Sequence, residues 1–273
     1  MTLLQASKLG TETLSHAGIE NAANESIWIL ESVTGKTRSD ILRIPSEAIG
    51  EDLLETYKEK LAERISGRPV QYILGKWEFY GREYYVNEGV LIPRPETEML
   101  VDFALEYLKG RKNPVIVDLC AGTGCIGLTV ASLIPDSQVY LVEKYDEAFA
   151  VLERNAEGVT NAKAVKGDIF DEKLISSLPQ CDLLLSNPPY IRHADIPSLQ
   201  SEVLREPLTA LDAGEDGLEF YRALGKIYGT ICKGAAAFEC GEDQGAALRE
   251  LLPGSEIIKD CFGNDRMVVL KEL

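Results

Sequence analysis

The chain has 273 residues, 45% of them hydrophobic, and a formal net charge of −16 at pH 7. This length suits one large domain with a smaller one, and the composition suffices for an ordinary globular core. A negative field of this size opposes contacts with phosphate groups. The charge therefore disfavours direct binding of nucleic acid.

Six cysteines are scattered without a Cys-x-x-Cys pair, and the chain has only two histidines. This spacing predicts neither a metal site nor a disulfide framework, so we expect no bound metal and mostly buried, reduced thiols. The first residues lack the pattern of a signal peptide, and no apolar run reaches the roughly 18 residues of a membrane span. We expect a cytoplasmic protein with no membrane partner.

Residues 1–73 show apolar positions at helical spacing, with Gly18, Gly35 and Gly50 as predicted helix ends. Ser46 is a candidate cap, although the position three residues later lacks the Glu or Gln of a capping box. Because this region carries no catalytic constellation, we expect a domain of four or five helices that recognises a partner or supports the rest.

Residues 74–95 form an aromatic, β-prone stretch, and its break at Gly81 predicts a hairpin that links two domains. Pro95 suits the first turn of a helix that continues to about residue 108. Strands and helices then alternate, with helices expected at 126–133 and 146–157. The expected strands are 115–119, 138–142, 162–166, 182–186, 235–240, 256–259 and 266–271. This order predicts an α/β domain over 96–273, with an open doubly wound sheet and its site at the carboxyl ends of the strands.

A glycine-rich loop joins the first of these strands to its helix. Gly122 and Gly124 allow the backbone to approach a ligand closely. About 20 residues later, Glu143 ends the second strand, where it can accept hydrogen bonds from both hydroxyls of a ribose. Strand, loop, helix and acid in this order predict a nucleoside site.

Two cofactors remain in competition for this loop. Gly127 completes a Gly-x-Gly-x-x-Gly pattern, which is also typical of NAD-dependent oxidoreductases. The helical beginning and the strand–turn–strand ending favour S-adenosylmethionine. Candidates for hydride chemistry are few, since His16 lies in the helical region and His193 in an expected exposed loop.

Asp168 and Ile169 follow the third strand of the alternating region. Asp168 is placed to bind the exocyclic amine of an adenine, with Ile169 against the face of the ring. An aspartate just before a helix near Glu172 is also typical of an N-terminal cap. The sequence leaves both interpretations of Asp168 open.

The tetrapeptide Asn187-Pro188-Pro189-Tyr190 stands where the fourth strand ends. Two prolines make a rigid loop and leave carbonyl groups that no strand can use. If this strand neighbours the first, the side-chain oxygen of Asn187 and the carbonyl of Pro188 can accept both N–H bonds of a planar amide or aryl amine. They would direct its nitrogen at a methyl group, with Tyr190 packed on the planar group. A plain strand-exit turn is the alternative.

The chain closely resembles the peptide-chain release factor glutamine methyltransferases, the PrmC/HemK family, over nearly its whole length. The matching motifs are Arg68-Pro69-x-Gln71-Tyr72-Ile73-x-Gly75, Pro93-Arg94-Pro95-Glu96-Thr97-Glu98, the glycine loop, Asn187-Pro188-Pro189-Tyr190, Glu206-Pro207-x-x-Ala210-Leu211, Gly214-x-x-Gly217-Leu218 and Glu239-x-Gly241-x-x-Gln244. The tetrapeptide alone is shared with DNA adenine methyltransferases. The Pro93–Glu98 block and the helical region are not.

The resemblance implies a Rossmann-like class I methyltransferase domain behind a small helical domain that recognises the substrate. It implies that S-adenosylmethionine methylates the side-chain amide of the glutamine in the Gly-Gly-Gln loop of class-1 release factors. The implied cofactor residues are Cys120, Ala121, Gly122, Thr123, Gly124, Glu143, Ile169 and Asn187, and the implied substrate residues are Asn187, Pro188, Pro189 and Tyr190. Cys120 departs from the family by replacing the first loop glycine.

Two other functions are weighed against this one. An adenine methyltransferase acting on nucleic acid shares the tetrapeptide but conflicts with the net charge of −16. A non-catalytic adaptor conflicts with the intact glycine loop, Glu143 and Asn187. We expect a monomer whose partner is a release factor.

Overall fold

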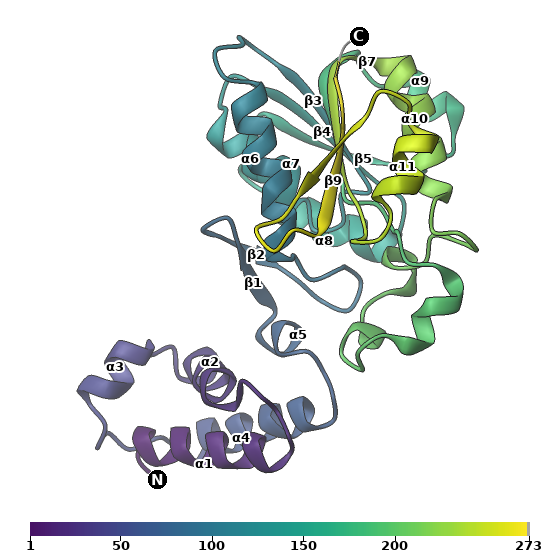
Figure 1. Ribbon diagram of the computed structural model, residues 1–273. Coiled ribbons are helices and arrows are strands. Elements are labelled where there is room, and N and C mark those ends of the chain that lie inside the picture. Colours follow the sequence, from purple (N-terminus) through teal and green to yellow (C-terminus); the bar gives the residue numbers. More distant parts are fainter. Residues whose placement is uncertain (272–273) are drawn as a thin grey trace. The chain divides into compact units, whose positions relative to one another are not determined.

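Residues 1–271 are described by the computed structural model, and they divide into two units. The first unit contains residues 1–76 together with the later segment 200–205, and the second contains the rest of the described chain. Figure 1 traces the elements of both. No helix of residues 1–271 is long and apolar enough to cross a membrane.

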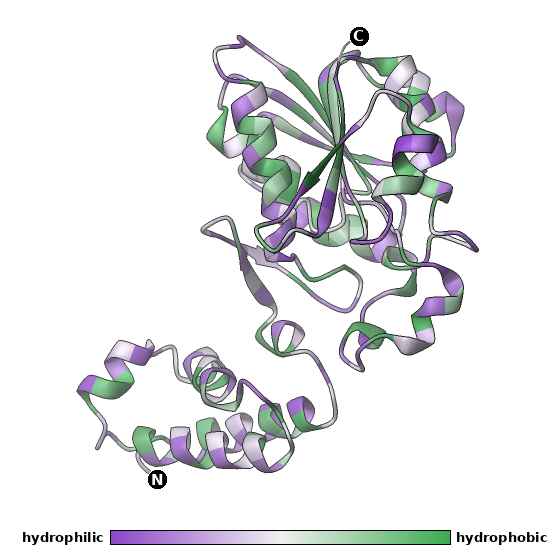
Figure 2. Cartoon of the chain, in the orientation of Figure 1, coloured by the Kyte–Doolittle hydropathy of each residue, from purple (hydrophilic) through white to green (hydrophobic). Residues whose placement is uncertain are grey.

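The first unit has five α-helices in the described chain. They are α1 (Leu3–His16), α2 (Ala22–Thr34), α3 (Arg38–Arg43), α4 (Glu51–Ile65) and α5 (Val70–Leu74). Their apolar faces share one core that includes Leu3, Leu30 and Tyr57. The helical prediction for this region is thus confirmed. Figure 2 shows these helices as a mixture of green and purple residues, as expected where one face is buried.

Two predicted helix boundaries in the first unit are wrong. Gly35 does end α2, in the left-handed conformation that glycine adopts readily, but Gly50 precedes α4 as its N-cap instead of ending a helix. Ser46 caps no helix, because α4 starts only at Glu51. The acidic side chains of Glu51 and Asp52 in the first turn favour that start, since a helix N-terminus carries partial positive charge.

An ion pair connects the segment 200–205 to the helices of the first unit. The guanidinium of Arg64 donates to Glu25 at 2.5 Å and to Glu202 at 2.5 Å. Arg64 is 4% exposed and Glu25 is 7% exposed, so each charge needs the other. This segment, which includes the short 3₁₀ helix Val203–Arg205, completes the surroundings of Arg64.

A β-hairpin is present in the predicted stretch 74–95, and all but its first residue belong to the second unit. Strands β1 (Lys76–Phe79) and β2 (Arg82–Tyr85) are joined by Tyr80 and Gly81, whose φ angles are 53° and 72°. Two consecutive left-handed residues are typical of the type I′ turn, which matches the twist of paired strands. The stretch of aromatic residues therefore forms a tight hairpin.

A mostly parallel sheet of seven strands, in the order β5-β4-β3-β6-β7-β9-β8, forms the centre of the second unit in the described chain. The strands are β3 (Val115–Leu119), β4 (Gln138–Glu143), β5 (Ala162–Lys166), β6 (Cys181–Ser186), β7 (Cys232–Glu239), β8 (Glu256–Lys259) and β9 (Asp265–Leu270). All seven predicted strands are present. The prediction that the fourth of them neighbours the first is confirmed by the parallel pairing of β6 with β3.

Helices cover both faces of this sheet. The described helical segments of the second unit are Pro95–Thr97 (3₁₀), α6 (Glu98–Tyr107), α7 (Cys125–Leu133), α8 (Asp146–Ala156), α9 (Glu172–Ser177), His193–Ser198 (3₁₀), Leu208–Ala210 (3₁₀), α10 (Glu219–Ile231) and α11 (Gly245–Leu251). Side chains alternate along each strand, so Ile116 packs in the core with α6 to α8 and Val117 in the core with α9 to α11. Figure 1 shows α6 and α7 on one side of the strands and α9, α10 and α11 on the other. The doubly wound fold follows.

Helix α7 differs from the amphipathic helices around it. Its residues from Cys125 to Ala131 are all buried, and Figure 2 shows the helix mainly in green. A helix that is apolar on every side must be enclosed, and α7 packs between α6 and the strands β3 and β4. This burial fixes the N-terminal end of α7, where the glycine loop enters.

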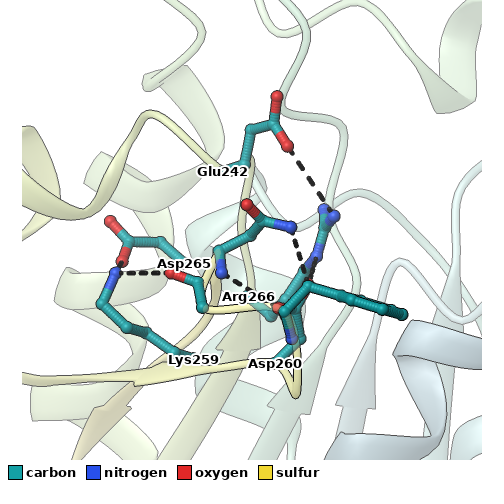
Figure 3. A network of polar contacts seen from close by, with 8 residues as sticks. Glu242, Lys259, Asp260, Asp265 and Arg266 are labelled. Carbon is teal, nitrogen blue, oxygen red and sulfur yellow. Dashed lines mark hydrogen bonds and ion pairs between the residues drawn. The ribbon is translucent and has the colours of Figure 1, made fainter.

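The turn between β8 and β9 is held by the carboxylate of Asp260 (Figure 3). It accepts hydrogen bonds from the backbone N–H groups of Phe262 and Asn264 at 2.9 Å and from the Nε of Arg266 at 2.9 Å. Burial opposes ionisation of Asp260, but these donors outweigh it and lower its pKa to about 2. The turn between these two strands, which the strand–turn–strand ending predicted, is thus part of a polar network.

Candidate functional site

The glycine loop runs from the end of β3 to the start of α7. Both glycines take left-handed φ angles, 55° at Gly122 and 79° at Gly124. A Cβ on Gly124 would lie 2.5 Å from the side chain of Leu152, whereas a Cβ on Gly122 would meet no protein atom within 4 Å. Gly124 therefore serves packing. Gly122 borders open space, as expected where a ligand approaches the backbone.

Cys120 holds a conformation that is unusual for its residue type. Its φ angle is 57°, in the left-handed region that favours glycine. Burial raises the pKa of its thiol, so the sulfur stays protonated and does not act as a nucleophile. The side chain lines the cavity described below. The family's loop has a glycine at this position. Here the backbone keeps the left-handed conformation that glycine favours, although the residue is a cysteine.

Glu143 ties the loop to the end of β4. Its carboxylate accepts backbone hydrogen bonds from Gly122 at 2.9 Å, Lys144 at 2.8 Å and Tyr145 at 2.9 Å. Glu143 is 6% exposed and reaches the cavity. A carboxylate has about four acceptor positions, so these three bonds leave one for a ligand. The acid predicted to bind ribose hydroxyls is also the anchor of the loop.

Asp168 and Ile169 both line the cavity. The Asp168 carboxylate pairs with the Lys144 ammonium at 2.9 Å and accepts the Phe170 backbone N–H at 3.0 Å. The interpretation of Asp168 as a helix cap is wrong, because Asp171 caps α9 by accepting the N–H of Lys173 at 2.9 Å. Contact of Asp168 with an adenine stays a prediction.

The tetrapeptide begins one residue after the end of β6. Ser186 is the register partner of Leu119, so Asn187 starts its loop beside Cys120. Asn187 and Pro189 line the cavity, whereas the buried Pro188 and the half-buried Tyr190 are not among the lining residues. The structure therefore brings Asn187 and Pro189 to the glycine loop. The roles predicted for the Pro188 carbonyl and the Tyr190 ring stay predictions.

The ring of Tyr190 packs against the apolar core between the sheet and α10. Burial raises the pKa of its phenol, which is therefore neutral. Its backbone carbonyl accepts a hydrogen bond from the side-chain amide of Gln244 at 3.0 Å, which fixes the end of the tetrapeptide. His193, just beyond, is exposed as expected and pairs with Asp212 at 2.7 Å.

The cavity at the carboxyl ends of β3, β4 and β6 encloses about 910 Å³, part of it open to solvent. Its predicted lining residues are Cys120, Ala121, Gly122, Thr123, Glu143, Asp168, Ile169, Asn187 and Pro189, while Gly124 lies behind them. Within residues 1–271 no group of His, Cys, Asp and Glu side chains is arranged to hold a metal ion.

Several lining residues received no role from the sequence. Arg94 and Thr97 come from the Pro93–Glu98 block, and Phe170 and Phe220 meet edge to face with their ring centroids 5.4 Å apart. The carboxylate of Glu206 pairs with Arg94 and also accepts the N–H of Ile92 at 2.9 Å. Arg94, Thr97 and Glu206 belong to motifs that the family resemblance had singled out, and this was the sequence signal for them. Nothing in the sequence indicated that the two phenylalanines would meet.

Asn155 is a further residue for which the sequence predicted no role. Its side-chain amide donates to the carbonyl of Thr123 at 2.9 Å and exchanges hydrogen bonds with the backbone of Tyr85 at 2.8 and 3.0 Å. It thereby joins the glycine loop to the hairpin. A single Asn in the pattern of α8 gives no sign of this task, because the pairing depends on how the hairpin folds onto the helix.

These residues fit a nucleoside-containing cofactor. Gly122 leaves space where a Cβ would stand, the carboxylate of Glu143 keeps one acceptor position, and Ile169 and Phe170 supply apolar surface. Asn187 lies in the same cavity, beside the loop. A ligand held there would have an amide side chain close to one end.

Comparisons with known proteins agree with this arrangement. Residues 5–75 match the family described as the PrmC N-terminal domain, and residues 97–216 match the methyltransferase small domain. The release factor glutamine methyltransferase of Bacillus subtilis is 37% identical over 98% of this chain and 96% of its own length. That of Clostridium acetobutylicum is 35% identical over 88% of each chain.

Solved structures show the same fold in distant proteins. The hMettl16 catalytic domain, solved in complex with MAT2A 3′UTR hairpin 6, aligns with a TM-score of 0.58 at 16% identity over 78% of this chain and 82% of that one. Human methyltransferase 10 domain containing protein aligns with a TM-score of 0.53 at 18% identity, over 79% and 97% of the two chains. The α/β methyltransferase fold predicted for the second unit is confirmed.

Proposed function

Because the chain belongs to the release factor glutamine methyltransferase family, we propose that it methylates the side-chain amide nitrogen of the glutamine in the Gly-Gly-Gln motif of class-1 release factors. Its methyl donor is S-adenosylmethionine. The observation that carries the proposal is the position of Asn187, which starts the loop after β6 beside Cys120 and shares one cavity with Gly122 and Glu143.

Residues of the cavity can be assigned to the parts of the cofactor. We assign its ribose to Glu143, its adenine to the surface of Ile169 with Asp168 at the amine, and the remaining contacts to the backbone of Cys120 through Thr123. Bound S-adenosylmethionine supplies an electrophilic methyl group on a sulfonium. The sulfonium provides the driving force, so the protein mainly has to align the nucleophile.

An amide nitrogen is a weak nucleophile, because its lone pair is delocalised into the carbonyl group. The side-chain oxygen of Asn187 and the carbonyl of Pro188 provide two acceptors for its two N–H bonds. Among residues 1–271 the structure records a hydrogen bond from the side-chain nitrogen of Asn187 but none to its side-chain oxygen. Accepting both N–H bonds directs the nitrogen and stabilises the positive charge that develops on it. Pro189 and Tyr190 complete the surface for the glutamine.

The tetrapeptide is rigid before any substrate arrives. Pro188 and Pro189 fix two φ angles, and Gln244 holds the Tyr190 carbonyl at 3.0 Å. Little reorganisation is then needed when the amide binds, which is what an alignment mechanism requires. No strong base is needed before transfer, since the proton is lost only after the nitrogen has been methylated.

The net charge of −16 indicates a partner with a basic surface. A release factor, which enters the ribosome, suits this requirement, and we assign its recognition to the helical first unit. We further propose that the protein acts as a monomer in the cytoplasm. Direct methylation of nucleic acid is not favoured, because this charge opposes phosphate contacts.

A labelling experiment tests the proposal. The protein is incubated with S-adenosylmethionine labelled in its methyl group and with a class-1 release factor, the same factor with Gln→Ala in the Gly-Gly-Gln motif, or duplex DNA. We expect label on the wild-type factor alone. Label on DNA, or equal label on the Gln→Ala factor, would contradict the proposal.

A further inference from the structure

Three polar side chains form a chain of hydrogen bonds that leads from the cavity wall, where Asn187 and Thr97 lie, to Glu239. The hydroxyl of Thr97 donates to the Glu239 carboxylate at 2.6 Å, and the Nδ2 of Asn187 donates to the Thr97 oxygen at 3.2 Å. Thr97 is 2% exposed and Glu239 is 4% exposed. Glu239 is the last residue of β7, and its neighbour Phe238 pairs in register with Ser186, so Glu239 and Asn187 lie side by side at the carboxyl ends of these two strands.

The direction of these bonds follows from counting protons. An ionised carboxylate only accepts hydrogen bonds, so the single hydroxyl proton of Thr97 is committed to Glu239. The Thr97 oxygen can then only accept, and only the NH₂ side of the Asn187 amide can serve it. The oxygen of that amide must therefore point away from Thr97.

This direction matters for the reaction because the two ends of an asparagine amide have nearly the same size. Turned by half a rotation, Asn187 would fit equally well but would present N–H bonds to the N–H bonds of an incoming glutamine. Packing alone cannot select the productive orientation. A hydrogen bond with a defined direction can.

We propose that Glu239, acting through Thr97, is a positioning residue for methyl transfer that holds the Asn187 amide with its oxygen toward the substrate nitrogen. The inference rests on the proposed function, since it concerns how Asn187 is made ready to accept the substrate amide. It assigns a task to Glu239 of the Glu-x-Gly-x-x-Gln motif and to Thr97 of the Pro93–Glu98 block. Neither residue needs to touch the transferred methyl group.

The surroundings of Glu239 add a dependence on pH. Burial raises the pKa of Glu239 to about 7, against the hydrogen bond from Thr97, with Glu96 raising it further and Arg266 and Arg94 lowering it. A protonated carboxyl can itself donate to Thr97, and the freed hydroxyl proton then turns toward Asn187. The selection of the amide orientation is thereby lost, so turnover is expected to decline below about pH 7.

The test uses Thr97→Val, which keeps the shape of the side chain and removes the hydroxyl. We expect turnover of a release factor to fall about 10- to 100-fold, with the Kd for S-adenosylmethionine within about 3-fold of wild type. Thr97→Ser keeps a hydroxyl and should recover most of the rate. Thr129→Val is the matched control, because Thr129 is a buried threonine bonded to Tyr84 at 2.7 Å and does not line the cavity.

A double variant separates positioning from a general structural effect. If Thr97 acts through Asn187, Thr97→Val should cost almost nothing further in an Asn187→Ala background, about 2-fold or less. If Thr97→Val costs as much in the Asn187→Ala background as it does alone, the inference is overturned. Wild-type turnover by Thr97→Val would also overturn it. So would a rise in the cofactor Kd of Thr97→Val as large as its loss of turnover. Wild-type turnover by Asn187→Ala would instead defeat the proposed function itself.

The pH dependence gives an independent readout. The decline of wild-type turnover below about pH 7 should disappear in Glu239→Gln, which cannot ionise and should be slower than wild type above that pH. A Glu239→Gln enzyme with the wild-type rate and the wild-type profile would contradict the role of Glu239. Circular dichroism and thermal melting of each variant establish that it is folded.

Discussion

The side-chain nitrogen of Asn187 lies 3.2 Å from the hydroxyl oxygen of Thr97, a residue 90 positions earlier in the chain. This bond leaves the amide oxygen of Asn187 as the group available to a substrate. It also connects the tetrapeptide to the Pro93–Glu98 block, two motifs that the sequence presents far apart. The two motifs therefore work as one site.

Asn187→Ala should remove most methyl transfer and leave cofactor binding largely intact. Losing an acceptor for the developing charge is expected to lower kcat by about 100-fold or more. The measurement is steady-state turnover of a release factor, with the Kd for S-adenosylmethionine from calorimetry. Gln138→Ala serves as the control, because Gln138 is an exposed amide at the opposite end of β4. Normal turnover by Asn187→Ala would disprove the assigned role.

Glu143→Gln should weaken binding of S-adenosylmethionine by about 10- to 100-fold, as expected for the loss of hydrogen bonds to a charged group. The apo protein should also melt at a lower temperature, since the Glu143 carboxylate holds three backbone N–H groups. Calorimetry and thermal melting give the two values. Glu153→Gln on the exposed face of α8 is the control, and an unchanged Kd in Glu143→Gln would refute the assignment.

Cys120→Gly should be more stable than Cys120→Ala, by up to about 1 kcal/mol. Both variants lose the sulfur, but only glycine adopts the φ angle of 57° at this position without a steric cost. Urea unfolding of the two variants measures the difference. Equal stability, or greater stability of the alanine variant, would show that the left-handed conformation carries no cost here.

The buried carboxylate of Asp118 should make stability fall as pH rises from about 4 to about 7. Burial raises its pKa from 3.8 to about 7, while the N–H of Gly127 lowers it and Glu143 raises it. The native protein then binds more protons than the unfolded chain in this window, a difference of about 1.4 kcal/mol per pH unit at most. One carboxylate oxygen of Asp118 has no hydrogen-bond partner within residues 1–271, in keeping with this cost.

Urea unfolding at several pH values checks this prediction. In Asp118→Asn the slope between about pH 4 and 7 should be smaller than in wild type, because one titrating group has been removed. The remaining slope belongs to groups such as Glu239, whose pKa is also raised to about 7. A wild-type slope in Asp118→Asn would mean that Asp118 titrates normally.

Added salt should weaken binding of a release factor more than it slows the methyl-transfer step. A net charge of −16 attracts a basic partner over a Debye length of about 10 Å at 0.1 M salt. We expect KM for the release factor to rise with salt while kcat changes little. A KM independent of salt would count against charge as a basis of recognition.

Much of the fold could be predicted because its strands are short apolar runs between turn residues. Val115 to Leu119 and Asp182 to Ser186 are examples, and their pairing followed from the order of a doubly wound sheet. The boundary at Gly50 could not be predicted in the same way, since glycine is common both after helices and at N-caps. The helix α10 was overlooked because its apolar residues follow a loop rich in glycine and acid.

The site was predictable where one local motif contains the contact. Gly122 and Glu143 follow from spacing alone, and their hydrogen bond of 2.9 Å confirms that they lie together. The link from Thr97 to Glu239 depends on a register between β6 and β7 and on where a 3₁₀ turn packs, which no local pattern encodes. Asp168 shows the same limit, because a cap at position 168 and one at position 171 look alike in sequence.

Locating the transferred methyl group tests the central claim most directly. A class-1 release factor is incubated with S-adenosylmethionine and either the wild-type protein or Asn187→Ala, and its peptides are analysed by tandem mass spectrometry. We predict a single methyl group on the side-chain nitrogen of the Gly-Gly-Gln glutamine with the wild-type protein and almost none with the variant. A methyl group on any other atom, or an undiminished yield with Asn187→Ala, would contradict the account.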